Sequence, residues 1–196
     1  MAINDTITEI RWHGRGGQGA KTASLLFAEI MLRTGNYYVQ AFPEYGPERM
    51  GAPVQAFNRI SRQVITIHSS ITSPDYIVVL DPSLLEDYNI IINGFTINSK
   101  IIINTSLSVT DIALKLNINK NNVYVVNARE ISLKTIGKYI PNAPMLGALL
   151  KIIGNINLNQ ALNSVEKKLL EKFRNKTEVI HGNLNAISSA FNEVSR

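Results

Sequence analysis

A glycine-rich turn between a predicted strand and a predicted helix constrains the fold more than any other feature of the sequence. Residues 14–19 read Gly-Arg-Gly-Gly-Gln-Gly, which fits the pattern G-x-G-x-x-G with one extra glycine. Residues 6–13 have the composition of a strand, and residues 20–34 repeat apolar side chains every three to four positions, as a helix does. Such a strand, turn and helix predict an α/β fold in which the turn lies at the carboxyl end of a strand.

The glycine turn is also the first candidate binding site, because backbone N–H groups at the start of a helix can meet a phosphate. Its candidate residues are Gly14, Arg15, Gly16, Gly17, Gln18 and Gly19. A complete dinucleotide site would need an acidic residue at the end of the second strand, whereas Glu44 comes slightly late, in a proline-rich loop. The turn therefore serves tight packing alone, a phosphate-bearing ligand or a partner chain, and a stand-alone Rossmann-type nucleotide-binding oxidoreductase remains the alternative function.

The remaining pattern predicts alternating strands and helices in a single domain over residues 1–196. We expect a three-layer α/β fold with a mostly parallel, Rossmann-like sheet, an antiparallel element and a helical C-terminal tail. The antiparallel element is a predicted hairpin of residues 54–60 and 64–68, with a tight turn between them. The other predicted strands are residues 37–42, 75–80, 100–104 and 122–127, and the other predicted helices are 84–87, 108–116, 145–153, 158–173 and 176–194.

Composition excludes several classes of function. The 196 residues include no cysteine, so the chain itself has no disulfide, no thiol catalyst and no cysteine-ligated cluster. Its three histidines lack the spacing of a local metal motif, so we assign no metal site. The net charge of +5 comes from scattered lysines and arginines without interleaved aromatics, which disfavours nucleic-acid binding. No apolar run is long enough to span a membrane, and the polar N-terminus lacks the pattern of a signal peptide, so we expect a cytoplasmic protein.

A second loop, over residues 43–53, is rich in proline, glycine and charge. Loops at the ends of strands are where α/β sheets place ligands and contacts. Within this loop Arg49 is the candidate for a functional charge, because arginine makes bidentate contacts with phosphate or carboxylate. A surface ion pair with Glu48 or Glu44 is the competing interpretation.

Five segments in order resemble one family. They read RWHGRGGQGAKTAS, FPEYGPERMGAPVQAFNRIS, PDYIVVLDPSLLE, KIIINTS and PNAPMLGALLKIIG, and they fall within residues 9–154. Together they are similar to the gamma subunit of pyruvate (2-oxoacid):ferredoxin oxidoreductase. The Ala52-Pro53-Val54 step favours the pyruvate-type branch.

The resemblance implies a heteromeric complex that oxidatively decarboxylates a 2-oxoacid with coenzyme A to acyl-CoA, CO2 and reduced ferredoxin. Thiamine diphosphate, Mg²⁺ and 4Fe-4S iron–sulfur clusters would belong to other subunits, and no cofactor would be bound by this chain alone. The implied partners are alpha, beta and ferredoxin-like delta subunits, with ferredoxin as electron acceptor. The isolated chain would be inactive and, with its interface uncovered, could form a homodimer. The glycine turn and Arg49 would then contact coenzyme A, another anion or a neighbouring subunit.

Four further features are assigned structural roles. His13, beside the glycine turn, is a conceivable general base but more often a structural residue in such a position. Asp81 is expected to cap the helix that follows it, and Trp12 is expected in the core or an interface. The apolar stripe Met145, Leu146, Leu149 and Ile152 predicts a helix face in the core, with burial by another subunit as the second interpretation.

Overall fold

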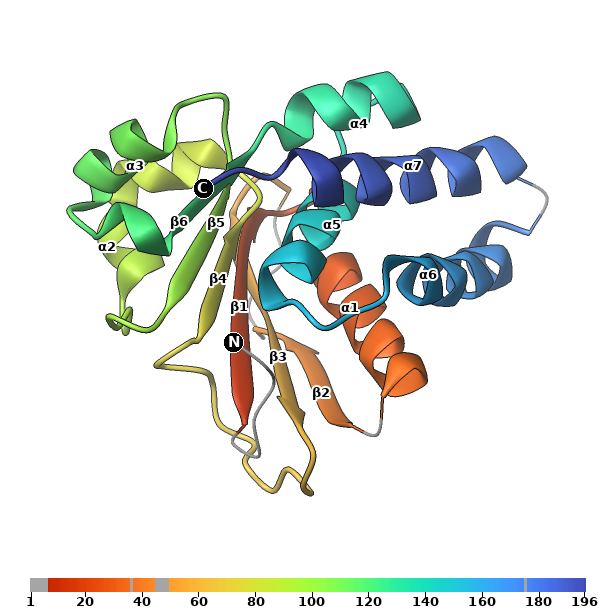
Figure 1. Ribbon diagram of the computed structural model, residues 1–196, viewed down its shortest axis with the longest axis horizontal. Coiled ribbons are helices and arrows are strands. Elements are labelled where there is room, and N and C mark those ends of the chain that lie inside the picture. The colour runs from red at the N-terminus through yellow and green to blue at the C-terminus, as the bar shows by residue number, and fades with distance from the viewer. Residues whose placement is uncertain (1–6, 36, 45–49, 175) are drawn as a thin grey trace.

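A computed structural model of the chain describes residues 7–35, 37–44, 50–174 and 176–196, and in these it shows one six-stranded sheet between two helical layers (Figure 1). The strand order is β2-β3-β1-β4-β5-β6. Strands β1, β4, β5 and β6 are parallel, β3 is antiparallel to β1, and β2 is antiparallel to β3. The strands are β1 (Thr8–Arg15), β2 (Tyr38–Pro43), β3 (Pro53–Ser61), β4 (Tyr76–Val79), β5 (Lys100–Asn104) and β6 (Val123–Val126). The predicted α/β class and mostly parallel sheet are confirmed.

The helices divide between the two faces of the sheet. On one face lie α1 (Ala20–Thr34), α4 (Ala128–Ile136), α5 (Asn142–Ile153), α6 (Leu158–Phe173) and α7 (Thr177–Glu193). On the other face lie the 3-10 helix η1 (Pro82–Asp87), α2 (Tyr88–Ile92) and α3 (Val109–Leu116), and a second 3-10 turn, η2 (Lys120–Asn122), leads into β6. The predicted helical C-terminal tail is confirmed, and its helices belong to the layer that covers one face of the sheet.

Strands β4, β5 and β6 each contribute to both cores. On β5, Ile102 faces the larger core with α5, whereas Ile101 and Ile103 face the smaller core with α2 and α3. Strands covered on both faces read as continuous apolar runs because neither face meets water. This explains why the sequences of β4, β5 and β6 show little polar alternation.

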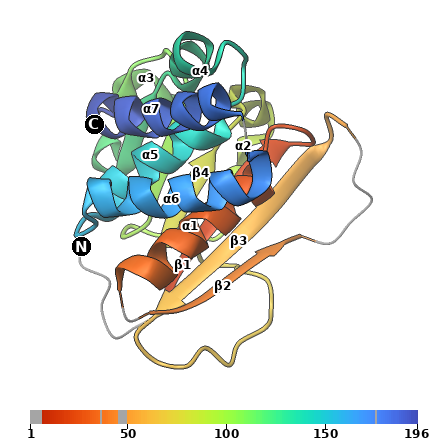
Figure 2. The same ribbon diagram turned by 90° about the vertical axis from the view of Figure 1, so that its right-hand side faces the viewer.

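The predicted hairpin of residues 54–60 and 64–68 is wrong in its second arm. Strand β3 pairs with β2 on one side and with β1 on the other, so no position beside it is left for residues 64–68. Those residues belong to a connection between β3 and β4 without regular secondary structure, seen as a wide loop in Figure 2. The predicted antiparallel element exists, but the strand that pairs with β3 in it is β2, which precedes β3 in the sequence.

The predictions for Trp12 and for the apolar stripe of α5 are confirmed as core. Trp12 is fully buried, its indole Nε1 donates to Asn58 Oδ1 at 2.8 Å, and its ring meets Phe27 edge-on. Helix α5 packs closely on α7, because a Cβ atom at Gly147 would lie 2.1 Å from the carbonyl oxygen of Ile187. Only glycine allows the two helices this approach.

Candidate functional site

The glycine turn joins the carboxyl end of β1 to α1 and requires two left-handed residues. Gly17 has φ of 95° and Gly19 has φ of 85°, a region that disfavours side chains. Gly19 is also crowded, since a Cβ there would lie 2.7 Å from Asn142 Nδ2 at the start of α5. The turn therefore brings the amino ends of α1 and α5 together.

Part of the turn is occupied by the chain's own backbone. The Gly16 N–H donates to Ala52 O at 2.8 Å, and the Gly51 N–H donates to Gly16 O at 3.2 Å. By contrast, the N–H groups of Gly17, Gly19 and Ala20 have no hydrogen-bond partner among the described residues. Half of the turn is thus fixed structurally, and the half that opens α1 keeps donors that bond to no described residue.

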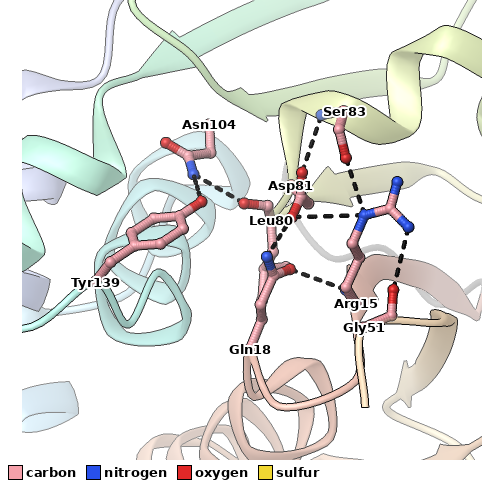
Figure 3. Close-up of polar contacts among 8 residues, drawn as sticks. All are labelled: Arg15, Gln18, Gly51, Leu80, Asp81, Ser83, Asn104 and Tyr139. Atoms are coloured by element: carbon pink, nitrogen blue, oxygen red, sulfur yellow. Dashed lines mark hydrogen bonds and ion pairs between the residues drawn. The ribbon is translucent and has the colours of Figure 1, made fainter. Parts of the chain in front are cut away.

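Arg15 lies in a polar network at the same edge (Figure 3). Its Nε donates to Ser83 Oγ at 2.9 Å and its Nη1 to Gly51 O at 3.1 Å, while Asp81 Oδ2 lies 3.8 Å from Nε. Gln18 connects the two residues, because its Oε1 accepts from the Arg15 N–H and its Nε2 donates to Asp81. The guanidinium is held in place and one third exposed.

Asp81 caps η1, as predicted, and also balances the charge of Arg15. Its Oδ1 accepts from the Ser83 N–H at 2.9 Å. Burial would raise its pKa, but the hydrogen bonds from Ser83 and Gln18 and the charge of Arg15 outweigh burial and lower it. Asp81 is therefore a carboxylate at neutral pH, and it anchors the turn of β1 to the end of β4.

Asn104 and Tyr139, which were not predicted from the sequence, extend this network to β5. Asn104 Nδ2 donates to Leu80 O at 2.8 Å and to Tyr139 Oη at 3.0 Å. Its Oδ1 accepts from the Arg129 N–H at 3.2 Å. The available signal was a polar Asn directly after the apolar run of β5, at the edge where parallel strands place their sites.

His13 lies on the opposite face of β1 from Trp12 and is buried. Its Nε2 accepts from Arg11 Nε at 3.0 Å, which places the imidazole proton on Nδ1. Burial, together with the charge of Arg11, lowers the pKa of His13 to about 3. A neutral imidazole with so low a pKa is a weak base, so the geometry favours the structural role.

A pocket of about 350 Å³ lies beside His13 and Arg15, between β3 and the η1–α2 segment. Its lining includes the carboxylates Glu44, Glu86 and Asp87 and, as cation, Arg15. Three carboxylates beside one guanidinium disfavour a phosphate inside the pocket. Any anion contact at this edge is therefore expected at the turn itself and not inside the pocket.

The structure brings together the six candidates from Gly14 to Gly19, whereas Arg49 lies outside the described residues. Within the described ranges, no three His, Cys, Asp or Glu side chains lie close enough together to hold a metal ion. None of the helices described is long and apolar enough to cross a membrane.

Comparisons with known proteins give one consistent result. Residues 9–193 match the family model described as pyruvate ferredoxin/flavodoxin oxidoreductase. The chain is 43% identical over 194 residues to pyruvate synthase subunit PorC of Thermotoga maritima, covering 99% of this chain and 98% of that protein. It is also 43% identical over 165 residues to the pyruvate/ketoisovalerate oxidoreductases common subunit gamma of Pyrococcus abyssi, covering 84% and 86%.

Among solved structures, the chain is similar to pyruvate oxidoreductase subunit PORC of Thermotoga maritima. The TM-score is 0.81 at 40% identity, covering 96% of this chain and 97% of that one. The similarity therefore extends over the sheet, both helical layers and the glycine turn.

Proposed function

Because the chain belongs to the pyruvate ferredoxin/flavodoxin oxidoreductase family, as a gamma subunit of a heteromeric 2-oxoacid:ferredoxin oxidoreductase, we propose that its own complex acts on pyruvate. The complex would convert pyruvate and coenzyme A to acyl-CoA and CO2 and reduce ferredoxin in the cytoplasm. The names of the relatives, pyruvate synthase and pyruvate/ketoisovalerate oxidoreductase, support pyruvate as a substrate.

The redox and thiamine chemistry belongs to the other subunits in this proposal. The chain has no cysteine to ligate an iron–sulfur cluster. Thiamine diphosphate, Mg²⁺ and the 4Fe-4S clusters are accordingly placed on alpha, beta and ferredoxin-like delta subunits. The residues of this chain bind and position coenzyme A, and they take no part in electron transfer.

The contribution of this chain is an anion contact for coenzyme A at the glycine turn. The observation that carries it is the set of N–H groups of Gly17, Gly19 and Ala20 that bond to no described residue, beside the fixed guanidinium of Arg15. No acidic residue lies in the first turn of α1, and Lys21 adds positive charge there. Free amides at a helix start favour a phosphate oxygen. Arg49 stays a proposed second contact, outside the described residues.

The alternative, a stand-alone dinucleotide-binding enzyme, receives no support from the strand order. In that site the acidic residue for ribose ends the strand beside the glycine turn. Here β3 separates β2 from β1, and β2 runs antiparallel to β3 at the edge of the sheet. Glu44, which follows β2, therefore lies one strand too far from the turn.

The test is steady-state kinetics of the assembled complex with an Arg15→Gln subunit. We expect the KM for coenzyme A to rise roughly tenfold, the effect of one lost charge-assisted contact, with the KM for pyruvate unchanged. Arg15→Lys, which keeps the charge, should recover part of the loss, and Arg33→Gln on the exposed surface of α1 is the matched control. An Arg15→Gln complex that assembles normally and keeps both KM values would refute the contact.

A further inference from the structure

The connection between β3 and β4 has a strand-forming sequence but pairs with no strand among the described residues. Residues 64–67 read Val-Ile-Thr-Ile, a run of β-branched side chains that favours a strand. Yet Val64 is 66% exposed and Ile67 is 44% exposed. Apolar, strand-forming residues placed on the surface are a feature of contact segments.

One side of residues 65–69 is held by side chains of the sheet. Arg59, which is only 1% exposed, donates from Nη2 to Ser69 O at 2.6 Å and from Nη1 to Ile67 O at 3.4 Å. Gln40 Nε2 lies 3.5 Å from Ile65 O. Carbonyl groups of three alternate residues therefore point the same way, as they do in an extended strand.

The same alternation leaves the other side open. In an extended chain the N–H and C=O groups of residues 64, 66 and 68 point away from Arg59 and Gln40. None of these backbone groups has a hydrogen-bond partner among the described residues. The two side chains thus take the place of a neighbouring strand on one side, and the opposite side is a free strand edge.

We infer that residues 64–68 are a docking edge, onto which another subunit of the oxidoreductase adds an extended strand. Strand addition to an exposed edge satisfies main-chain groups and buries alternate side chains. The inference rests on membership of a heteromeric complex and not on the coenzyme A contact proposed above.

Charge indicates the kind of strand that fits. Residues 62–74 contain Arg62 and His68 and no acidic residue. The complementary strand carries a carboxylate opposite Arg62 and an apolar residue beside Val64. A second copy of this segment has no carboxylate to place opposite Arg62, so a different subunit is the better partner.

Hydrogen exchange at single-residue resolution tests the edge directly. The amides of Val64, Thr66 and His68 should exchange rapidly in the isolated chain and about tenfold or more slowly in the assembled complex. Equal exchange of these amides in both samples would overturn the inference.

Two proline variants separate docking from folding. Thr66→Pro removes an outward N–H, whereas Ser69→Pro removes an inward N–H that bonds to no described residue. With tagged chains expressed beside the other subunits, native mass spectrometry should show at least about a tenfold loss of complex for Thr66→Pro and less than about twofold for Ser69→Pro. Equal assembly of the two variants overturns the inference. So does a homodimer of the wild-type chain that Thr66→Pro abolishes, since the occupant would then be a second copy.

Discussion

The two halves of the sheet are stabilised in different ways. Strands β4, β5 and β6 are covered by helices on both faces, and most of their side chains are buried and aliphatic. The β2–β3 ribbon is covered by α1 on one face, and on the other it relies on polar contacts of Arg59 and Gln40 with the connecting segment. The parallel half is therefore stabilised mainly by buried apolar side chains. The ribbon instead holds a connecting segment whose outward backbone groups are the proposed contact for a partner.

The largest expected difference between the halves concerns core volume. Ile102→Ala, at a fully buried position of β5, should lower the free energy of unfolding by about 3–4 kcal/mol through lost burial and a cavity. Val39→Ala on β2, which is only half-buried, should cost about 1 kcal/mol. Urea denaturation of both variants measures this, and equal costs would contradict the contrast between the halves.

The second prediction sharpens the role of Arg59. Its Nε pairs with Glu9 Oε1 at 2.7 Å, and its other nitrogens hold the connecting segment. Arg59→Met should lower the free energy of unfolding by about 2–3 kcal/mol, because it leaves carbonyl groups and Glu9 without their partner. It should also speed tryptic cleavage after the exposed Arg62.

The control for Arg59 is the exposed pair of Arg33 with Glu29 on α1. Arg33→Met should change stability by no more than about 0.5 kcal/mol, since solvent screens surface pairs. If Arg59→Met matched this small effect and left cleavage unchanged, the ribbon would not depend on polar contacts.

The last prediction concerns a pH dependence at β1, the strand that joins the two halves. The pKa of His13 is about 3 in the folded chain, against 6.5 ordinarily. Below pH 6.5 His13 becomes protonated in the unfolded chain but stays neutral in the folded chain. The free energy of unfolding therefore falls by up to about 1.4 kcal/mol per pH unit as the pH drops toward 3. Above pH 6.5 this contribution is fully present.

His13→Gln keeps an acceptor for Arg11 and cannot titrate, so its stability should fall less steeply between pH 6.5 and 4. Thermal unfolding of both proteins across that range measures the difference. Parallel curves for the variant and the wild type would show that His13 titrates normally.

Sequence patterns located the strands of both halves to within about two residues, but they predicted the wrong partner for β3, for a physical reason. The apolar periodicity of α1 and the continuous apolar run of β5 are local signals, and both elements formed where expected. Residues 64–68 carry an equally strong local signal for a strand, but strand formation needs a partner, and β1 and β2 already fill both sides of β3. Strand pairing depends on residues that are far apart in the sequence. A predicted tight turn after β3 therefore could not show which segment pairs with that strand.

The candidate site was predicted in part. The glycine pattern indicated a tight turn between a strand and a helix, and in the structure Gly17 and Gly19 of that turn have left-handed conformations. The network from Arg15 through Asp81 to Asn104 joins residues that are distant in sequence and meet only because β1, β4 and β5 end at one edge. Spacing along the chain carries no information about such contacts until the strand order is known.

Native mass spectrometry of the tagged chain, isolated under anaerobic conditions from its own cells, tests the central claim most directly. The account predicts that the chain is recovered with larger, cysteine-bearing subunits and iron–sulfur clusters, in a sample that reduces a dye when given pyruvate and coenzyme A. Recovery as a monomer or homo-oligomer with a bound nucleotide and no other subunit would contradict it.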